Sequence, residues 1–434
     1  MKIAVIADDI TGAGDTGVQF AKRGLQVSVL LQFMSETGSM SERDVLVLDT
    51  DSRSLDAESA YQRAAEASRC AQTYGADVVF KKIDSTMRGN LGSEIDAVYD
   101  TFRPDFVIIA PAYPETGRLV QEGRLYVHGK PLHETEFAND PKTPVTESYI
   151  PDLLHRQTKQ PIEVIPSAIL AGGSSAFELV MQSCMSRGIS YLLVDSADDD
   201  DLRRIVSLVG ETTYSTVWVG SAGLARQLAI QHSSLTQPSS QECRKTDGPI
   251  LIVIGSVSPR SRRQLDVLLS NPEVRGIQME AYRLVSGKTE REQELAKAEE
   301  EAALTLSANL HTVLYSSGDR EAIRLAQDTG IRSGMDAQEV SNAISQALGE
   351  SVSRVLRRVR VGGIVMTGGD TAKHVCSALH AIEFRVLDEV ESGVPIGLLM
   401  MDEPLSAITK AGGFGSDQVL LRALESLNGG IGRI

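Results

Sequence analysis

Carboxylates and glycines share one short stretch near the amino terminus, ADDITGAGDTG at residues 7–17. The glycines have the spacing G-x-G-x-x-G, at Gly12, Gly14 and Gly17. In dinucleotide-binding folds this spacing lets the backbone approach a pyrophosphate at a helix N-terminus. Here three carboxylates surround the glycines, those of Asp8, Asp9 and Asp15. Their electrostatic repulsion of a pyrophosphate would be on the order of several kcal/mol. We therefore expect the stretch to bind a group that carboxylates attract, and not a dinucleotide.

Acids and bases also follow two further apolar runs, in LDTDSRS at 48–54 and KKIDSTMRGN at 81–90. Carboxylates accept hydrogen bonds from sugar-like hydroxyls, whereas Lys, Arg and a helix N-terminus, which we expect after Gly14, bind a carboxylate. The side chains concerned are Asp49, Asp51, Arg53, Lys81, Lys82, Asp84, Ser85 and Arg88. Together with Asp8 and Asp9 they suit a small, hydroxylated, anionic molecule. The alternative is that the acids cap helices and the bases form surface ion pairs.

The second half of the chain has three glycine-rich turns after apolar runs, GSVSPRSRRQ from 255, TGGDTA from 367 and KAGGFGSD from 410. Backbone N–H groups in such turns bind phosphate oxygens, and nearby Ser and Thr hydroxyls add donors. Each turn alone is typical of an ordinary helix cap, but three together predict a nucleoside triphosphate site. The best match to a Walker A motif, YRLVSGKT, has Tyr282 where the first glycine belongs, and protein-kinase signatures are absent.

Apolar, β-branched runs that alternate with helical stretches should position both sets of residues. In the first half these runs occupy 2–7, 44–49, 77–83, 106–111, 190–195 and 216–220. In the second half they occupy 249–256, 312–317, 362–370 and 396–401, with helical stretches near 291–308, 335–358 and 416–427. Such alternation predicts parallel sheets covered on both faces, with ligands beyond the carboxyl ends of the strands. The predicted fold class is α/β: two α/β domains with mostly parallel sheets and an inter-domain cleft.

The 434 residues exceed what one hydrophobic core usually organises. Residues 231–248, QHSSLTQPSSQECRKTDG, are polar and lack an apolar period, which predicts a linker. We therefore expect an acid-binding domain at 1–230 and a nucleotide-binding domain at 249–434. The turn-rich, charged segment at about 112–150 should stand off the first sheet, with a β-hairpin in it.

The net charge of −15 argues against nucleic acid or an anionic membrane surface as a partner, since both require a basic surface. The start MKIAVIADD is too short for a signal-peptide core, and no run reaches the roughly eighteen apolar residues of a membrane helix. The four cysteines lack a C-x-x-C pattern, so we expect inert thiols. These features predict a cytoplasmic protein.

The stretches ADDITGAGD, KKIDSTMRGN, GSAGLA at 220–225, GSVS, TGGDTA and KAGGFGSD resemble, in this order and over essentially the whole chain, the four-carbon acid sugar kinases. KKIDSTMRGN and ETEFANDPKTP at 134–144 resemble the D-threonate and D-erythronate kinases more than the 3-oxo-tetronate kinases. The resemblance implies an N-terminal domain that binds the acid, a C-terminal domain that binds ATP, and phosphate transfer to the hydroxyl at carbon 4. D-threonate is the expected substrate, with D-erythronate and 3-oxo-tetronate as alternatives.

Carried over residue by residue, the resemblance places the acid sugar on Asp9, Arg53, Lys82, Ile83, Asp84 and Ser85. It places ATP on Ser256, on Gly368, Gly369, Asp370 and Thr371, and on Gly412, Gly413, Phe414 and Gly415. Phosphoryl transfer also needs charge neutralisation, which we assign to Mg²⁺ and Lys82, and a group that takes the hydroxyl proton. Asp84 and Asp9 are the candidates for that group, and we favour Asp84 because neighbouring Lys82 and Arg88 should keep it ionised. Asp370 is a candidate to hold Mg²⁺ through water.

Two rival classes stay open: a nicotinamide-dependent oxidoreductase, in which Glu36 would contact a ribose, and a sugar-acid sensor without activity. The acids around the glycines weigh against the first, and the lack of a visible DNA-binding module weighs against the second. The sequence also leaves open the stereochemistry of the acid, the Mg²⁺ ligands and the oligomeric state. Residues 112–150 are the candidate interface of a homo-oligomer.

Overall fold

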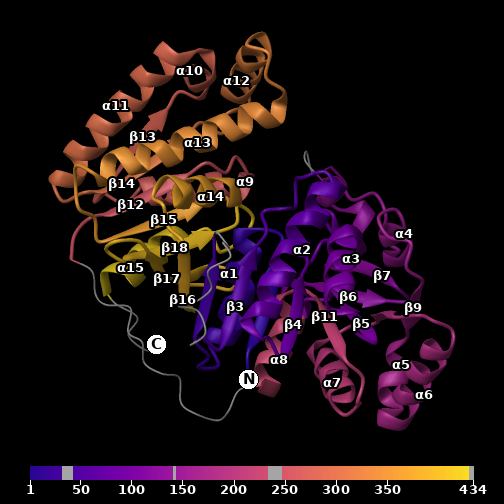
Figure 1. The fold of residues 1–434 in the computed structure, drawn as a ribbon. Coiled ribbons are helices and arrows are strands. Elements are labelled where there is room, and N and C mark those ends of the chain that lie inside the picture. Colours follow the sequence, from indigo (N-terminus) through magenta and orange to yellow (C-terminus); the bar gives the residue numbers. More distant parts are fainter. Residues whose placement is uncertain (32–42, 140–142, 233–246, 430–434) are drawn as a thin grey trace. The chain divides into compact units, whose positions relative to one another are not determined.

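The structure, a computed structural model, describes residues 1–31, 43–139, 143–232 and 247–429. It divides into two compact units, Met1–Ser239 and Ser240–Ile434, and each has a sheet covered by helices (Figure 1). The predicted α/β class with mostly parallel sheets is therefore confirmed. The predicted linker at 231–248 lies largely outside the described residues, because helix α8 ends at His232 and the description resumes at 247. The inter-domain cleft stays a prediction.

The N-terminal unit is built on a parallel sheet with the strand order β2-β3-β1-β4-β11-β5-β10-β9. Its strands are β1 (Ile3–Ala7), β2 (Val27–Leu30), β3 (Val45–Asp49), β4 (Val78–Lys82), β5 (Phe106–Ala110), β9 (Ile162–Ile165), β10 (Tyr191–Val194) and β11 (Thr216–Gly220). Its helices are α1 (Ile10–Ala21), α2 (Ala57–Tyr74), α3 (Leu91–Phe102), α4 (Ile150–His155), α5 (Ser167–Ala171), α6 (Gly173–Ser186), α7 (Asp199–Gly210) and α8 (Ala222–His232).

The central strands of this sheet end level with one another. Ala7, the last residue of β1, is in register with Asp49 of β3 and Lys82 of β4. Gly220 of β11 is in register with Lys82 and with Ala110 of β5. The chain runs from β1 outward to β2 and β3 and then returns to β4 on the other side of β1, so the strand order reverses between β1 and β4. Open α/β sheets bind ligands at such a reversal.

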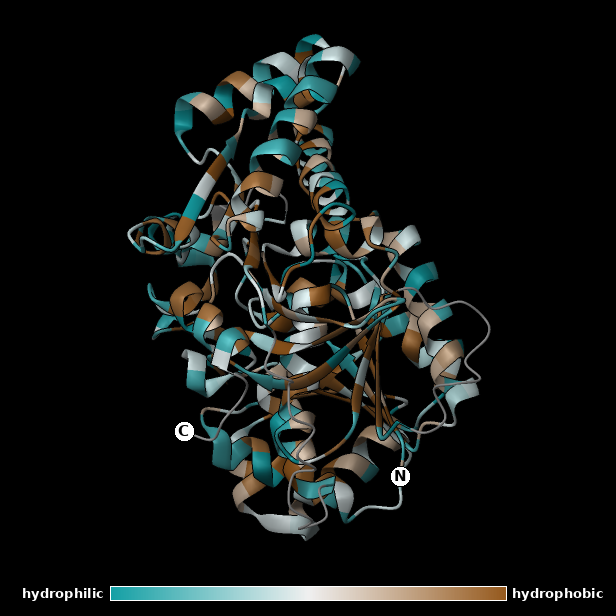
Figure 2. Cartoon of the chain, turned by 90° about the vertical axis from the view of Figure 1, so that its left-hand side faces the viewer, coloured by the Kyte–Doolittle hydropathy of each residue, from teal (hydrophilic) through white to brown (hydrophobic). Residues whose placement is uncertain are grey.

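Two layers of helices bury the sheet. Helix α1 packs against α8, which packs against α7, while α2 packs against α3 (Figure 1). Right-handed crossovers place α1 on one face and α2 and α3 on the other. All residues of β1, β3 and β5 are buried, which is why their sequences are continuous apolar runs. In Figure 2 the strands are accordingly mostly brown, whereas the helices mix brown and teal.

Residues 112–150 contain a second, antiparallel sheet, β6 (Arg118–Gln121), β7 (Arg124–Val127) and β8 (Lys130–Pro131). It is followed by two short 3-10 helices, Leu132–Glu134 and Glu136–Asn139. Isolated bridges tie this sheet to the rest of the unit, Val120 to Ser196 and Arg124 to Tyr149. The small sheet is therefore anchored at several points of its own unit.

The C-terminal unit has the strand order β13-β14-β12-β15-β18-β17-β16, with β17 antiparallel to both of its neighbours and the other pairs parallel. Its strands are β12 (Ile250–Ile254), β13 (Val274–Met279), β14 (His311–Ser316), β15 (Gly363–Thr367), β16 (Glu383–Glu389), β17 (Pro395–Met400) and β18 (Leu405–Lys410). Its helices are α9 (Pro259–Leu269), α10 (Ala281–Ser286), α11 (Lys288–Ser307), α12 (Arg320–Arg332), α13 (Ala337–Leu356), α14 (Gly369–Ala378) and α15 (Val419–Gly429).

The three glycine-rich turns follow three neighbouring strands of this second sheet. Thr367 of β15 is in register with Ile254 of β12 and with Lys410 of β18, so the turns begin at one level. The strand order reverses between β12 and β15, as it does in the first unit between β1 and β4.

Within the described residues, no helix has the length and apolar character needed to cross a membrane.

Candidate functional site

The glycines of the G-x-G-x-x-G spacing lie inside helix α1 and not in a turn before it. The helix begins at Ile10 and Asp9 is its N-cap, with Asp9 Oδ1 accepting the Gly12 N–H at 2.7 Å. A Cβ on Gly12 would lie 2.7 Å from Asp9 Oδ1 and 3.1 Å from Lys82 Nζ, so a side chain at residue 12 would displace both groups. The expectation that the helix starts after Gly14 is wrong, because Asp9 already caps it. The dinucleotide interpretation consequently has no glycine turn to support it.

Arg53 joins the carboxyl ends of β1 and β3. Its Nε donates to Asp8 Oδ2 at 2.6 Å and its Nη2 to Asp8 Oδ1 at 3.0 Å, while Nη1 donates to Asp9 Oδ2 at 2.8 Å. Asp8 is buried, and although burial opposes its charge, Arg53 lowers the pKa of Asp8 below its ordinary value. One guanidinium therefore holds two consecutive acids.

Asp84 lies in the turn after β4 and is enclosed by donors. Arg88 Nε donates to Asp84 Oδ2 at 2.8 Å and Arg88 Nη2 to Oδ1 at 3.1 Å, and the Thr86 hydroxyl also donates to Oδ2. Arg53 Nη2 lies 4.0 Å from Asp84 Oδ1. Burial opposes the charge, yet Arg88 and Arg53 hold the pKa of Asp84 well below its ordinary value. Two arginines therefore keep Asp84 ionised. Arg88 was predicted to do so, whereas Arg53 acts instead of the predicted Lys82.

The two lysines at the end of β4 are buried, with Lys81 0% and Lys82 4% exposed. Lys81 Nζ lies 2.5 Å from Glu94 Oε2, so this pair is a buried ion pair beneath the cluster. Lys82 Nζ donates to the main-chain oxygen of Ile83 at 2.9 Å and approaches Gly12 of α1. Neither Lys82 nor Arg53 belongs to a surface ion pair, so that alternative does not describe them.

The remaining predicted residues of this region, with Asp49, differ in their burial and in their hydrogen-bonding groups. The Ile83 side chain is fully buried and its N–H donates to the Gly220 oxygen at 2.9 Å, so Ile83 fixes the turn that carries Asp84. Ser85 is half-buried in that turn. Burial, reinforced by the charges of Asp51 and Asp9, raises the pKa of Asp49 well above its ordinary value. In its protonated form Asp49 is a hydrogen-bond donor beside the ionised acids.

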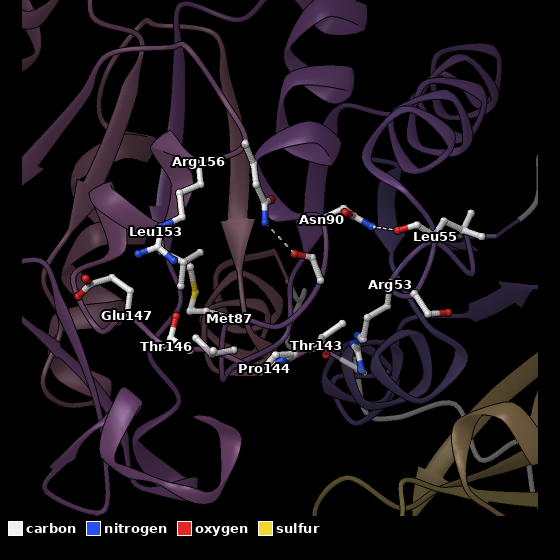
Figure 3. A pocket seen from close by; sticks show the side chains of 14 residues that line it. Arg53, Leu55, Met87, Asn90, Thr143, Pro144, Thr146, Glu147, Leu153 and Arg156 are labelled. Carbon is white, nitrogen blue, oxygen red and sulfur yellow. Dashed lines mark hydrogen bonds between the residues drawn. The ribbon is translucent and has the colours of Figure 1, made fainter. Parts of the chain in front are cut away.

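A cavity of about 320 Å³ opens beside Arg53 (Figure 3). Its volume is at the lower end of the range of ligand pockets, about 300 to 1,000 Å³. The loop after β4 contributes Met87 and Asn90, and Asn90 holds one wall by donating to the Leu55 oxygen at 2.8 Å. Arg156 of the segment after α4 stands on the opposite side in Figure 3. Among the predicted site residues Arg53 alone lines this cavity, so the cavity adjoins the carboxylate cluster.

Sequence reasoning missed Arg118, the first residue of β6. Its guanidinium carbon lies 5.9 Å from the centroid of the Phe137 ring, and that of Arg88 lies 5.5 Å from the same centroid. The ring therefore connects Arg118 to the cluster around Asp84. No motif surrounds Arg118 in the sequence, and only the strand register of residues 112–150 brings it here.

In the C-terminal unit the three glycine-rich turns contact one another. The Ser258 hydroxyl of the first turn donates to the Gly412 oxygen of the third at 2.8 Å. The Gly368 N–H of the second turn donates to the Lys410 oxygen at 2.8 Å. A Cβ on Gly412 would lie 2.2 Å from Ser256 Oγ, so a side chain at residue 412 would displace the Ser256 hydroxyl of the first turn. The predicted residues of the three turns thus form one surface.

Several N–H groups on this surface have no acceptor among the described residues. Helix α14 begins at Gly369, and no side chain caps the N–H groups at its start. In the third turn, the N–H groups of Gly412, Gly413 and Gly415 make no hydrogen bond to any described residue. Free N–H groups at a helix start and in a tight turn form an anion-binding concavity.

Two buried side chains donate hydrogen bonds to the carbonyl oxygens of the third turn. Lys410 Nζ donates to the oxygens of Ala411 at 2.9 Å and Phe414 at 3.2 Å. Gln264 Nε2 donates to the oxygens of Phe414, Gly415 and Ser416 at 3.0, 3.2 and 2.9 Å. Burial, with the charge of Arg260, lowers the pKa of Lys410 to about 7. Most carbonyl oxygens of the turn therefore accept hydrogen bonds from within the unit, whereas the N–H groups of Gly412, Gly413 and Gly415 donate to no described residue.

Phe414 differs from its expected role, because its ring packs inward. A Cβ on Gly393 would lie 2.3 Å from the ring, and Phe414 joins the hydrophobic core around β12 and β18. Its contribution to a ligand site is limited to main-chain atoms. In the described part of the chain, no three His, Cys, Asp or Glu side chains are grouped as a metal site. Mg²⁺ that is bound together with a nucleotide needs only one or two protein carboxylates. Asp370, in the first turn of α14, is a carboxylate of this kind.

Two family models match the chain, one for each unit. The first, described as a sugar-binding N-terminal domain, covers residues 3–228. The second, described as a nucleotide-binding C-terminal domain, covers residues 251–420. The two matches divide the chain in the same order as the carboxylate cluster and the glycine-rich turns.

Curated relatives that are similar over almost the full length carry kinase names. A D-threonate kinase from Salmonella typhimurium is 38% identical over 98% of each chain. A D-erythronate kinase from Heliobacterium modesticaldum is 31% identical over 98% of this chain and 97% of the relative. A 3-oxo-tetronate kinase from Pseudomonas fluorescens is 27% identical over 99% of this chain and 97% of the relative.

A solved structure supports the fold over the same extent. A Salmonella typhimurium LT2 protein described as a tRNA synthase superposes with a TM-score of 0.79 at 26% sequence identity. The match covers 97% of this chain and 98% of that chain. Both units therefore have counterparts in one known structure.

Proposed function

Since this chain belongs to the four-carbon acid sugar kinase family, we propose that it transfers the γ-phosphoryl group of ATP to the terminal hydroxyl, at carbon 4, of D-threonate. The observation that carries the proposal is the presence of two complementary sites on one chain. A cluster of ionised carboxylates and guanidinium groups suits a hydroxylated acid, and a surface of free backbone N–H groups suits a triphosphate. D-threonate is proposed over D-erythronate because the D-threonate kinase relative shares 38% identity and the D-erythronate kinase relative 31%.

For the acid, we assign the hydroxyls to the carboxylate of Asp9 and to Lys82, while Arg53 and Asp84 hold this part of the site in shape. Carboxylate acceptors bind polyol hydroxyls, and their own ion pairs keep them in place when the site is empty. Arg53 fixes Asp9, and Arg88 fixes Asp84. The acid sugar would therefore meet acceptors that need no rearrangement.

The hydrogen-bond pattern favours Asp9 over Asp84 as the acceptor of the hydroxyl proton. A carboxylate has about four lone-pair positions. Asp84 receives donors from the Thr86 hydroxyl and N–H and from the Arg88 guanidinium and N–H. Asp9 receives three, from Gly12 N–H, Thr11 hydroxyl and Arg53. Asp9 therefore keeps a position for the substrate hydroxyl, and we assign to Asp84 the positioning of the arginines.

For the nucleotide, we assign the phosphates to the three glycine-rich turns, through Ser256, the residues Gly368 to Thr371, and Gly412 to Gly415. Mg²⁺, when bound with ATP, neutralises charge on the phosphate oxygens. Asp370, in the first turn of α14, is the carboxylate assigned to it. Lys410 and Gln264 hold the third turn in shape by binding its carbonyl oxygens.

The experiment is an ADP-release assay with Mg²⁺ and ATP against D-threonate, L-threonate, D-erythronate, L-erythronate and 3-oxo-tetronate. We expect the highest kcat/KM with D-threonate, by about tenfold or more, which corresponds to about 1.4 kcal/mol of differential transition-state binding. Comparable values for another tetronate would reassign the substrate within the family. ADP release that no acid stimulates would overturn the proposal.

A further inference from the structure

Arg118 is fixed at the carboxyl edge of the first sheet through its main chain. Its N–H donates to the Tyr113 oxygen at 3.0 Å, and the Tyr113 N–H donates to the Arg118 oxygen at 2.9 Å. Tyr113 follows β5, whose last residue, Ala110, is in register with Gly220 of β11. The backbone of Arg118 thus starts from the sheet edge at which the turn of Asp84 also lies.

The side chain of Arg118 approaches the carboxylate cluster through Phe137. The guanidinium carbons of Arg118 and Arg88 lie 5.9 and 5.5 Å from the centroid of the Phe137 ring. A ring face attracts one cation, but two guanidinium groups beside the same ring repel each other. Arg88 is compensated by its two hydrogen bonds to Asp84. The second positive charge, that of Arg118, needs an anion of its own.

The described residues supply no such anion. Arg118 Nη1 donates to the Thr116 oxygen, whereas Nε is buried and has no hydrogen-bond partner there. No carboxylate of the described residues forms an ion pair with Arg118. Burial lowers the pKa of Arg118, and the more distant Asp84 and Glu136 compensate only in part. A buried guanidinium N–H without an acceptor is unfavourable unless a ligand provides one.

We propose that Arg118 binds the carboxylate of the sugar acid, with Nε as one of two donors in a bidentate pair. This assignment rests on the proposed function, since it names the group of that substrate which the small sheet recognises. The planar fork of arginine matches a carboxylate, and Arg53 and Arg88 already hold the protein's own acids. The substrate is thereby oriented, with its carboxylate at Arg118 and its hydroxyls toward Asp9. Arg118 is then the residue that distinguishes an acid from the uncharged polyol of the same length.

The test compares D-threonate with threitol, in which a hydroxymethyl group replaces the carboxylate. We expect Arg118→Gln to lower kcat/KM for D-threonate by about ten- to a hundredfold, because a charge-assisted pair is lost. Turnover of threitol, or its inhibition constant against D-threonate, should change less than threefold, and the KM for ATP should not change. Arg118→Lys should recover part of the loss. Arg124→Gln is the matched control, since Arg124 lies on the neighbouring strand β7 with its side chain 49% exposed.

An equal loss on the acid and on threitol, or no loss on either, would overturn the assignment. Calorimetric titration of D-threonate into wild type and Arg118→Gln distinguishes a failure of this assignment from a failure of the proposed function. If the wild type binds D-threonate and Arg118→Gln does not, while neither transfers phosphate, the carboxylate site stands and the kinase proposal fails. If the wild type phosphorylates D-threonate and Arg118→Gln binds it equally well, the kinase proposal stands and the carboxylate site fails. A melting curve of each variant excludes unfolding as the cause, and Arg118→Lys replaces Arg118→Gln if the latter is unfolded.

Discussion

The guanidinium of Arg53 binds the carboxylate of Asp8 through two hydrogen bonds, Nε to Oδ2 at 2.6 Å and Nη2 to Oδ1 at 3.0 Å. Asp8 is only 2% exposed, so its charge depends on this partner. The pair links β1 to the loop after β3, and it also fixes the cation that holds Asp9. The same side chain therefore neutralises the buried Asp8 and orients Asp9.

Arg53→Ala should lower the free energy of unfolding by about 3 to 5 kcal/mol at pH 7, because it leaves Asp8 buried without a partner. In this variant the pKa of Asp8 should lie above its unfolded value, so the penalty is present above that value and shrinks as the pH falls toward 4. Urea unfolding at several pH values measures both effects. Arg187→Ala is the control, since its pair with Glu163 at 3.2 Å is largely exposed and should contribute about 1 kcal/mol or less. A loss in Arg53→Ala no larger than in the control would contradict the assignment.

Asp9→Asn should lower kcat by about 10² to 10⁴, the usual contribution of a general base. Asparagine is a good N-cap, so α1 and the melting temperature should be preserved. Asp84→Asn should instead raise the KM for the acid and lower stability, because Arg88 and Arg53 lose an ionised partner. Steady-state kinetics with melting curves separate the two. A large fall in kcat for Asp84→Asn with near-normal kcat for Asp9→Asn would return the base to Asp84.

Gly413→Ala tests the third glycine-rich turn. No atom lies within 4 Å of a Cβ built at Gly413, so the substitution should leave the fold unchanged. If ATP phosphates bind the N–H groups of this turn, the methyl group should weaken ATP about tenfold, or about 1.4 kcal/mol. Gly429→Ala, at a second glycine with open space, is the control and should leave ATP affinity unchanged. Unchanged ATP affinity in Gly413→Ala, measured by calorimetry, would argue against phosphate at this turn.

Lys410 should make stability depend on pH in the alkaline range. Burial lowers the pKa of Lys410 to about 7, whereas the unfolded chain holds its proton to a pH near 10.5. Between these values the unfolded state binds more protons, so the contribution of Lys410 to stability rises with pH, by up to about 1.4 kcal/mol per pH unit. Lys410→Met lacks this term. The stability of the wild type relative to Lys410→Met should therefore rise from pH 7 to pH 10, and a constant difference would exclude a titrating Lys410.

The sequence predicted β1, β3, β4, β12 and β15 because these strands are buried on both faces and read as continuous apolar runs. It did not predict β18, the strand that precedes the third glycine-rich turn. The strands of residues 249–434 that alternate polar and apolar residues escaped prediction. The residues VRGIQM, which form β13, are an example, because Arg275, Gly276 and Gln278 are exposed and the other three are buried. The stretches after β1, β3 and β4 were expected to lie together because parallel strands end at a common edge, and Arg53 does lie beside Asp8, Asp9 and Asp84.

Contacts between distant segments could not be predicted in the same way. The start of α1 was misplaced because three glycines suggested a turn, whereas the N-cap bond of Asp9 and the close approach of Lys82 to Gly12 require helix there. The burial of Lys410 beneath its own turn leaves no pattern in the sequence. Arg118 reaches the cluster through the register of the small sheet and the position of Phe137, neither of which local spacing reveals.

The most direct test of the account is the ³¹P NMR spectrum of the product formed from ATP, Mg²⁺ and D-threonate. Transfer to the hydroxyl at carbon 4 gives one new phosphate ester, whose signal is split into a triplet by the two protons of that carbon. The account predicts this triplet together with an equal amount of ADP. A doublet would place the phosphate on carbon 2 or 3, and ADP with inorganic phosphate alone would contradict a sugar-acid kinase.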